Sequence, residues 1–558
     1  MKCVDNTLKW EDLKLDYEGE NEYTSFFSST GNLHTYPAKA VPKMVNDLIK
    51  RVMSIKTIKT VVDPFVGSGT TALESKYLGL DFWGSDLNPL AILLSKTKVL
   101  TIDNTTYTKK RLNEFITQIK KEYTDSYLVP VCRFDNIDYW FKKENIHELN
   151  FLKYKIDQFI SKTNKFDQEM YALILLTAFS STIRRVSLTR NSEFKLYRMS
   201  PGDINRFSIS AIEEFGESVT HLLDMLVVAN DSYKMKTQST ICLQNAKALN
   251  NLSNESIDLV ITSPPYGDSR TTVAYGEFSR LSLQWMQDLL KKYVGIEVKK
   301  CNCDEQLLGG RNSEWSLQDE TDFYKSNEIA NLEMQMSNRT QEKKDNLARA
   351  KDVLKEMKTS ISNDQYVSTD LLHKSEILYQ LIFERVRLDI YRKIKNSKAG
   401  LKDKETKKMA KKNAGEYMKQ MENVYSAKYV IRQAHLEEKL EKVAETLDRN
   451  EKSIQKRKED VFIFLKDLYK VVLETDRVMK KGGFQVWIVG HRTVMGKLTI
   501  NMEGILKDWF LNMGYECEAS LSRKYSFKRM PHHINSTIER CEEVNTMMNE
   551  YILVVRKK

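Results

Sequence analysis

A strand, a glycine-rich turn, a helix and a second strand follow one another between residues 60 and 86. The run Thr60-Val61-Val62 is mostly β-branched, residues 71–78 carry a helical pattern, and residues 81–85 form the second strand pattern. In this order the helix crosses back over the sheet, so that the two strands lie parallel. The sequence therefore predicts an α/β fold around a mostly parallel sheet.

Two further stretches, 237–286 and 461–558, also alternate strand and helix patterns. Residues 101–236 and the highly charged residues 287–460 have mainly helical patterns. We therefore predict a doubly wound core in three pieces, which begins with 21–100 and is interrupted by two mainly helical insertions. The elements expected in the later pieces are strands at 241–243 and 259–261, a helix at 464–479, a break at 481–483, a strand at 484–489, a helix at 503–513 and a closing strand at 551–555.

The charge balance suits an anionic partner. The 558 residues include 87 Lys and Arg against 76 Asp and Glu, a formal net charge of +11, and the 41% of hydrophobic residues exclude a wholly disordered chain. Nucleic acid suits this excess, but so does a merely soluble basic protein. Residues 391–460 hold 20 Lys and Arg against 12 Asp and Glu. This segment is either a DNA-facing surface or a solvated helix face laced with ion pairs.

The cysteines and the hydropathy pattern favour a cytoplasmic protein. Of seven cysteines only Cys301 and Cys303 lie close together, so no second pair completes a zinc site, and the odd number argues against a disulfide framework. The N-terminus has no apolar core and therefore does not resemble a signal peptide. The longest apolar run, near 171–179, is shorter than the roughly 20 residues that span a bilayer. We expect reduced thiols, no metal ion and no membrane segment.

The turn after the first strand predicts a binding loop. Gly67 and Gly69 allow a tight turn and a close approach of a ligand, and the amides at the following helix N-terminus face that ligand. The loop is not a phosphate-binding P-loop, because Thr70 stands where that motif has lysine. Asp86 ends the second strand, where a carboxylate binds ribose hydroxyls. Its alternative role is to cap the next helix.

A second loop, Ser263-Pro264-Pro265-Tyr266, follows the apolar strand expected at 259–261. The two prolines fix their φ angles, so the loop is stiff and presents acceptors and an aromatic ring. Acceptors aimed at an amino group on a base ring stabilise the positive charge that develops when this poor nucleophile attacks. Ser263 and the Pro264 carbonyl are the candidate acceptors, and Tyr266 can stack on a base that has left the helix. The alternative is a rigid structural turn.

Together these loops resemble motifs I and IV of the amino-directed DNA methyltransferases. Residues 63–71 match the D-P-F-x-G-S-G-T-T form, Ser263–Tyr266 match the tetrapeptide, and residues 34–39 resemble motif X. The resemblance implies a Rossmann-like methyltransferase core that binds S-adenosylmethionine. Asn245 stands where the family usually has an acidic residue beside the adenine, and its amide oxygen could still accept from the adenine amino group. The implied cofactor contacts are Tyr36, Pro37, Asp63, Pro64, Phe65, Gly67, Ser68, Gly69, Thr70, Asp86, Asn245 and Ala246, and the implied catalytic residues are Ser263, Pro264, Pro265 and Tyr266.

The resemblance also implies a reaction. Serine at position 263 goes in this family mostly with cytosine N4, so we expect cytosine N4 methylation in double-stranded DNA, after base flipping, within a restriction–modification system that can include a cognate endonuclease. Adenine N6 methylation, RNA methylation and a catalytically silent DNA-binding protein are the alternatives. Arg270 and Arg280 are candidate phosphate contacts or plain ion-pair residues, and 526–531 are a candidate DNA-facing segment. His491 is expected to be structural.

Overall fold

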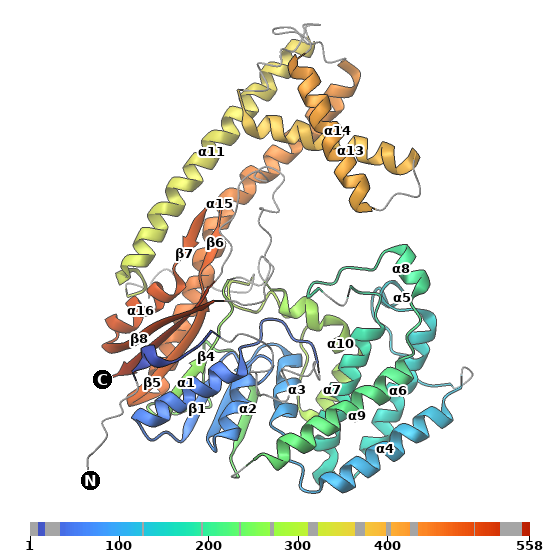
Figure 1. The fold of residues 1–558 in the computed structure, drawn as a ribbon, viewed down its shortest axis with the longest axis vertical. Helices are drawn as coiled ribbons and strands as arrows, with labels where there is room; N and C mark the ends of the chain where they lie inside the picture. Colours follow the sequence, from blue (N-terminus) through green and yellow to red (C-terminus); the bar gives the residue numbers. More distant parts are fainter. Residues whose placement is uncertain are drawn as a thin grey trace.

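A seven-stranded sheet forms the centre of the molecule (Figure 1). The computed structural model describes residues 9–16, 34–124, 128–190, 193–233, 236–267, 273–310, 322–362, 374–397, 403–423, 433–495, 497–524 and 549–558. The strand order is β3-β2-β1-β4-β5-β9-β8, in which the first five strands are parallel and β9 runs antiparallel to both of its neighbours. The strands are β1 (Thr60–Asp63), β2 (Asp81–Asp86), β3 (Ser239–Leu243), β4 (Ile257–Thr262), β5 (Met479–Gly490), β8 (Tyr515–Lys524) and β9 (Asn549–Lys557). The predicted mixed α/β fold with a mostly parallel sheet is confirmed.

Both faces of the sheet are covered because side chains alternate along its strands. Val61 packs into one apolar cluster and Val62 into another on the opposite face, and Leu259 and Val260 of β4 divide in the same way. The first cluster includes α1 (Pro42–Ile55), α2 (Thr70–Tyr77) and α3 (Pro89–Lys98), and the second includes α15 (Gln433–Val478) and α16 (Met502–Asn512). Burial on both faces explains why the central strands are continuously apolar.

The chain between α3 and β3 forms a helical lobe beside the sheet (Figure 1). The core of this lobe is α7 (Lys165–Val186), whose residues from Tyr171 to Phe179 are all buried. The apolar run near 171–179 is therefore a core helix of the protein. The other helices of the lobe are α4 (Thr105–Glu122), α5 (Ile137–Trp140), α6 (Lys143–Ser161), α8 (Pro201–Arg206) and α9 (Ala211–Asp231). From the chain after β4, α10 (Tyr275–Leu289) also packs on α7.

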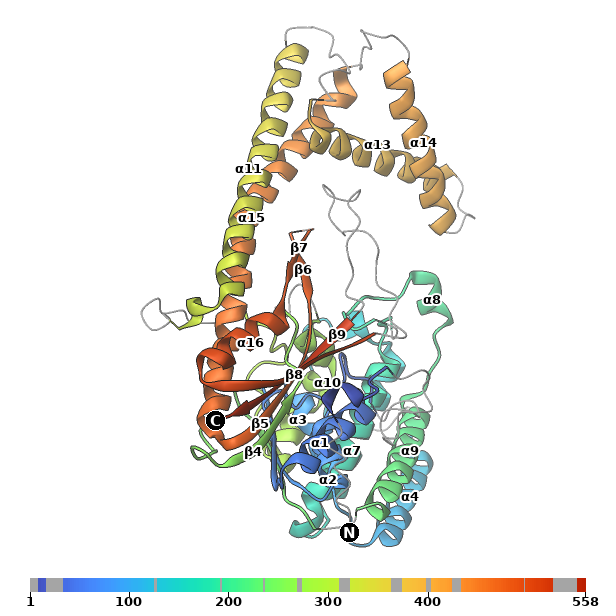
Figure 2. The ribbon, with the colours of Figure 1, turned by 60° about the vertical axis from the view of Figure 1, so that its left-hand side comes forward.

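A second helical part rises from the sheet as an arm (Figure 2). Its helices α11 (Asn327–Ser362) and α15 run side by side, and α13 (Glu376–Ser397) and α14 (Asp403–Asn423) lie at the far end. Lys351 of α11 pairs with Asp448 of α15 at 2.8 Å, and Lys358 pairs with Glu441 at 2.6 Å. These two lysines of α11 thus form ion pairs with acidic residues of α15.

The structure corrects the expected break at 481–483. β5 is continuous from Met479 to Gly490, and the chain between Met479 and Phe484 bulges: these two residues pair with Ile257 and Leu259, which are only two positions apart. Gly482 takes a φ of +68° in this bulge, which explains the glycine. The preceding helix is also longer than expected, since α15 begins at Gln433 and is continuous through residue 460.

The strand β8 was not predicted. Its outward positions carry Glu516, Ser520 and Ser522, as is usual for a strand at the edge of a sheet with one face in solvent. Among the described residues, no helix is long and apolar enough to cross a membrane.

Candidate active site

One pocket joins the two loops that the sequence singled out. It lies at the carboxyl ends of β1, β2, β3 and β4, where the strand order reverses between β1 and β4. This edge is where open α/β sheets bind ligands. The predicted residues that line the pocket are Tyr36, Asp63, Pro64, Phe65, Gly67, Ser68, Thr70, Asp86, Asn245, Ala246, Ser263 and Pro265, whereas Pro37, Gly69, Pro264 and Tyr266 do not line it.

The Asp63 carboxylate connects the segments around the pocket through hydrogen bonds. Its Oδ1 accepts from the backbone amide of Phe65 at 3.0 Å and from the hydroxyl of Thr262 at 2.6 Å, and its Oδ2 accepts from the hydroxyl of Thr71 at 2.8 Å. Burial raises the pKa of the Asp63 carboxyl to about 6. Because both oxygens are engaged within the protein, this residue shapes the loops around the pocket.

The glycine turn needs glycine for two different reasons. Gly67 and Gly69 have φ angles of +51° and +82°. At Gly69 a Cβ would also lie 2.8 Å from the Cα of Ser95, so that only glycine fits against α3. The Ser95 hydroxyl donates to the Gly67 carbonyl at 2.8 Å and fixes the turn. Gly69 therefore supports the pocket without lining it.

Asp86 reaches the turn from the neighbouring strand. Its Oδ2 accepts from the Gly67 amide at 3.1 Å and its Oδ1 from the Asn88 amide at 2.8 Å. Burial raises the pKa of the Asp86 carboxyl to about 6. The alternative role as helix cap is taken by Asn88, whose side chain accepts from the Leu90 amide at 3.1 Å at the start of α3. Asp86 therefore does not cap α3, and its side chain lines the pocket.

The segment 34–39 closes one side of the pocket. The hydroxyl of Tyr36 accepts from Asn88 at 3.1 Å, and its ring lies 6.0 Å from that of Tyr275. His34 anchors the segment through a 2.7 Å contact between its Nε2 and the Ser180 hydroxyl of α7. Burial lowers the pKa of the His34 ring to about 4, so this anchor is neutral. Lys39 also lines the pocket, and burial lowers the pKa of its amine.

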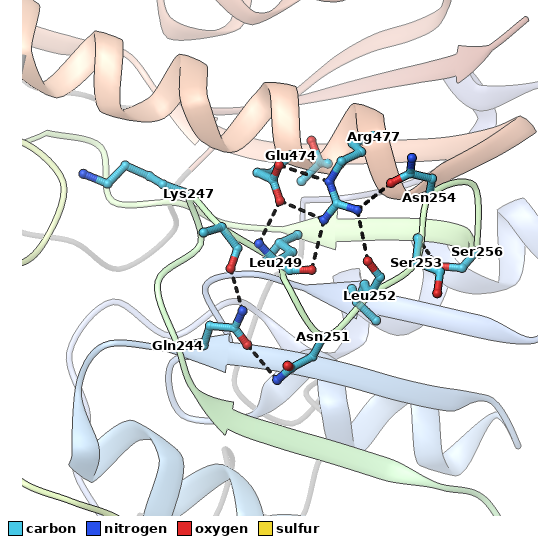
Figure 3. Close-up of polar contacts among 12 residues, drawn as sticks. Gln244, Lys247, Leu249, Asn251, Leu252, Ser253, Asn254, Ser256, Glu474 and Arg477 are labelled. Carbon is cyan, nitrogen blue, oxygen red and sulfur yellow. Dashed lines mark hydrogen bonds and ion pairs between the residues drawn. The ribbon is translucent and has the colours of Figure 1, made fainter. Parts of the chain in front are cut away.

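The loop after β3 carries Asn245 and Ala246 into the pocket and is clamped from α15 (Figure 3). Arg477 donates to the carbonyls of Leu249 and Leu252, both at 3.0 Å, while Glu474 accepts from the Leu249 amide at 2.8 Å. The Asn245 amide oxygen, expected to face an adenine amino group, already accepts from the Lys247 amide at 3.0 Å. The clamp is a contact of the tertiary structure, and no pattern in the sequence predicts it.

A further wall of the pocket comes from residues 306–308, which the sequence did not point to. Asp467 of α15 holds this wall and the β3 loop together, since its Oδ2 accepts from the Gly309 amide at 2.9 Å and its Oδ1 pairs with Lys247 at 2.7 Å. At the other end, Asp304 accepts from the Gly276 amide at 2.9 Å and so caps α10. No motif marks this segment because its contacts come from elements far apart in the chain.

The proline loop starts where β4 ends. Its Ser263 lines the pocket, and the Ser263 Oγ lies 3.4 Å from the hydroxyl of Tyr266. That tyrosine donates to Oε1 of Glu550 in β9 at 2.9 Å. The half-buried tyrosine ring packs at the edge of the second apolar cluster, outside the pocket lining.

Other residues named from the sequence lie away from the pocket or outside the described residues. The Arg280 guanidinium lies 5.9 Å from the ring centroid of Trp140. The ring of His491 stacks on that of Tyr551 at 3.8 Å, and burial lowers its pKa. Arg270 and residues 526–531 lie outside the part of the chain that the structure describes. Within the described residues, no group of three or more His, Cys, Asp or Glu side chains is placed to hold a metal ion.

Fold and pocket together define the class of protein: an α/β protein with a pocket at the carboxyl edge of its sheet, which is lined by a glycine turn and by the start of a proline-stiffened loop. Sequence comparisons with known proteins identify the class more closely. Residues 9–97 match the sequence profile of a DNA methylase family, N6_N4_Mtase. The chain is 36% identical to the type II methyltransferase M.MvaI of Kocuria varians over 311 aligned residues, which cover 52% of this chain and 65% of that relative. It is 32% identical to the type II methyltransferase M.MjaII of Methanocaldococcus jannaschii over 96 residues, 17% of each chain.

Both the family match and the relative M.MvaI support the amino-directed methyltransferase family for this chain. The matched part spans less than two thirds of the length of M.MvaI. Among solved structures, the rRNA methyltransferase aviRa from Streptomyces viridochromogenes is similar over 45% of this chain and 73% of its own, at 13% identity and a TM-score of 0.18.

Proposed function

We propose that the protein is a site-specific DNA methyltransferase that transfers a methyl group from S-adenosylmethionine to cytosine N4 in double-stranded DNA. One observation carries the proposal: the glycine turn at Gly67 and the proline loop at Ser263 line the same pocket. A methyl donor bound along the turn and a base amino group beside the loop are then within one site. Positioning of this kind supplies much of the acceleration in a direct transfer.

The residues around the turn fit S-adenosylmethionine. A Cβ at Gly67 would lie 3.7 Å from the Tyr36 ring, at van der Waals distance, so this ring lies directly beside the glycine turn. Asp86 offers carboxylate oxygens for the ribose hydroxyls, and Phe65, Ala246 and Leu308 provide apolar surface for an adenine ring. When bound, the cofactor supplies an electrophilic methyl group.

The proline loop would act on the base. The Ser263 hydroxyl and the Pro264 carbonyl accept from the two amino hydrogens and stabilise the positive charge that grows on the nitrogen. The nitrogen forms a bond to the methyl carbon as the carbon–sulfur bond breaks, and the extra proton then leaves to water. No covalent enzyme intermediate is required. Tyr266 would stack on the extruded base.

Cytosine N4 is preferred over adenine N6 because the first residue of the tetrapeptide is Ser263. A restriction–modification role, with a cognate restriction endonuclease as partner, fits the two relatives that are named type II methyltransferases. Adenine N6 methylation is the second candidate, and a DNA-binding protein without catalysis is the third. We place the protein in the cytoplasm with its DNA substrate.

The test is transfer of labelled methyl groups from S-adenosylmethionine to mixed-sequence duplex DNA, followed by mass spectrometry of the nucleosides. N4-methylcytosine is the expected product, and N6-methyladenine would overturn the base assignment. Ser263→Ala should lose most activity, whereas Ser54→Ala on the exposed end of α1 should keep it. DNA binding without any label on DNA would favour the non-catalytic alternative.

A further inference from the structure

Glu550 joins the proline loop to the antiparallel end of the sheet. It lies at the start of β9, opposite Gly490 of β5 and Arg523 of β8. Glu550 is 8% exposed and Arg523 is 6% exposed, and the Nε of this arginine donates to the Glu550 Oε2 at 2.6 Å. The other oxygen, Oε1, accepts from the hydroxyl of Tyr266 at 2.9 Å. A buried ion pair thus presents one of its oxygens to the catalytic loop.

Stability alone gives little reason for such a pair. Removing two charges from water costs several kcal/mol per ion, and well-packed apolar residues often serve as well or better. A carboxylate paired with a guanidinium offers acceptors and no donor. It therefore determines the direction of any hydrogen bond that reaches it. This property matters here because the hydroxyls of Tyr266 and Ser263 can each donate or accept.

Glu550 sets the direction of the hydrogen bonds that connect it, through Tyr266 and Ser263, to the pocket. Tyr266 gives its single hydroxyl proton to the carboxylate, so its oxygen can only accept from the Ser263 hydroxyl, whose Oγ lies 3.4 Å away. The Ser263 proton then points towards Tyr266, away from the pocket. Its lone pairs are left to accept from a donor in the pocket that this serine lines.

We infer that Glu550 is a positioning residue of the methyl-transfer site, which orients the hydroxyls of Tyr266 and Ser263 so that the serine acts as an acceptor for the base amino group. The inference rests on the proposed function, because it concerns the same serine and the same amino group. It adds a residue that lies 284 positions from the tyrosine in the sequence.

The variant Glu550→Gln tests the direction of the hydrogen bonds. Glutamine has the same shape, but its amide can donate to Tyr266 and so reverse the order of donors. We expect kcat to fall about tenfold to a hundredfold, while KM for S-adenosylmethionine stays within about threefold. Glu516→Gln is the matched control: it lies in β8, pairs with Arg556 at 3.1 Å and is far from the pocket, so kcat should not change.

A second variant distinguishes loss of function from misfolding, since Glu550→Gln also removes the negative charge that pairs with Arg523. Tyr266→Phe keeps the ion pair and the ring and removes only the hydroxyl. It should reduce kcat by a similar factor, and the double variant should be no worse than either single variant within about twofold, because both break one chain of hydrogen bonds. Multiplying losses, or full activity of Tyr266→Phe, would overturn the inference.

Wild-type activity separates the two proposals. If the wild type methylates DNA and Glu550→Gln equals it in kcat, the positioning role is wrong and the proposed function stands. If the wild type transfers no methyl group to any DNA, the proposed function fails and the inference falls with it.

Discussion

The Thr262 hydroxyl at the end of β4 donates a 2.6 Å hydrogen bond to Oδ1 of Asp63 at the end of β1. These two residues immediately precede the proline loop and the glycine turn, so the bond connects the two loops of the pocket at their bases. Both partners are buried, with exposed fractions of 1% and 3%. The distance between the methyl donor and the base would therefore depend on this contact.

Removing that bond should loosen the pocket. In Thr262→Val the shape is kept but Asp63 loses one of its donors, which should lower the free energy of unfolding by about 1–3 kcal/mol. S-adenosylmethionine affinity should fall at the same time. Urea unfolding and calorimetric titration measure the two effects. Thr240→Val on the exposed side of β3 is the control, and equal losses in both variants would contradict the prediction.

Gly69→Ala should destabilise the protein, because the new Cβ meets the Ser95 Cα at 2.8 Å and the residue has a φ of +82°. The strain alone is worth about 1–3 kcal/mol. The control is Gly415→Ala in the middle of α14, where a Cβ meets nothing within 4 Å. That substitution should raise the stability by up to about 1 kcal/mol. Thermal or urea unfolding of both variants measures the change in stability. A change of the same sign in the two variants would contradict the prediction.

Cofactor affinity should depend on pH through Asp86. Burial raises the pKa of this carboxyl to about 6, so it becomes protonated below that pH and loses acceptors for the ribose hydroxyls. S-adenosylmethionine affinity should then fall by up to about tenfold per pH unit below 6. Titrations at several pH values measure this. In Asp86→Asn the affinity should be low and flat with pH; a persistent slope would assign the effect to Asp63, whose pKa is also raised to about 6.

The same two carboxyls have an opposite effect on stability. Their folded-state pKa of about 6 lies above the value near 3.9 of an unfolded chain. Each therefore contributes stability that is fully present below pH 4 and is lost as the pH rises through 6. Asp63→Asn should make the free energy of unfolding less dependent on pH between 4 and 7, measured by urea unfolding. An unchanged slope would contradict the prediction.

Arg477→Lys should free the loop after β3. Lysine cannot replace the guanidinium that bonds the carbonyls of Leu249 and Leu252 together with Glu474 (Figure 3). We expect faster hydrogen exchange in residues 247–254 and about tenfold weaker cofactor binding. Arg449→Lys, an exposed arginine of the same helix that bonds only its own turn, is the control. Equal hydrogen exchange of residues 247–254 in the two variants would show that Arg477 does not hold this loop.

A further prediction concerns the arm and the salt dependence of DNA affinity. If the exposed Lys408 and Lys411 of α14 contact phosphates, changing both to glutamine should reduce the slope of log affinity against log salt by about 2 for duplex DNA. Lys351 and Lys358 are the control, because both already pair with acidic residues of α15. An unchanged slope in the α14 variant would leave the arm without phosphate contacts at these positions.

The sequence alone determined the local parts of this protein. Short β-branched runs followed by turns and helices define parallel strands, and polar residues at the carboxyl ends of such strands must meet at one edge. For that reason Asp63, Asp86 and Ser263 could be placed in one pocket in advance. The resemblance to the amino-directed methyltransferases rests on the same local runs of residues.

Only the tertiary structure decided the contacts that lie far apart in the chain. The bulge at Gly482, the clamp of Arg477 and the pairing of Glu550 with Tyr266 all depend on which neighbours the fold supplies. Isolated charged and polar residues carry no periodic pattern, so their partners cannot be read from the sequence. Local hydrogen bonding and apolar spacing act within a few residues, whereas burial and ion pairing act between whichever elements the sheet brings together.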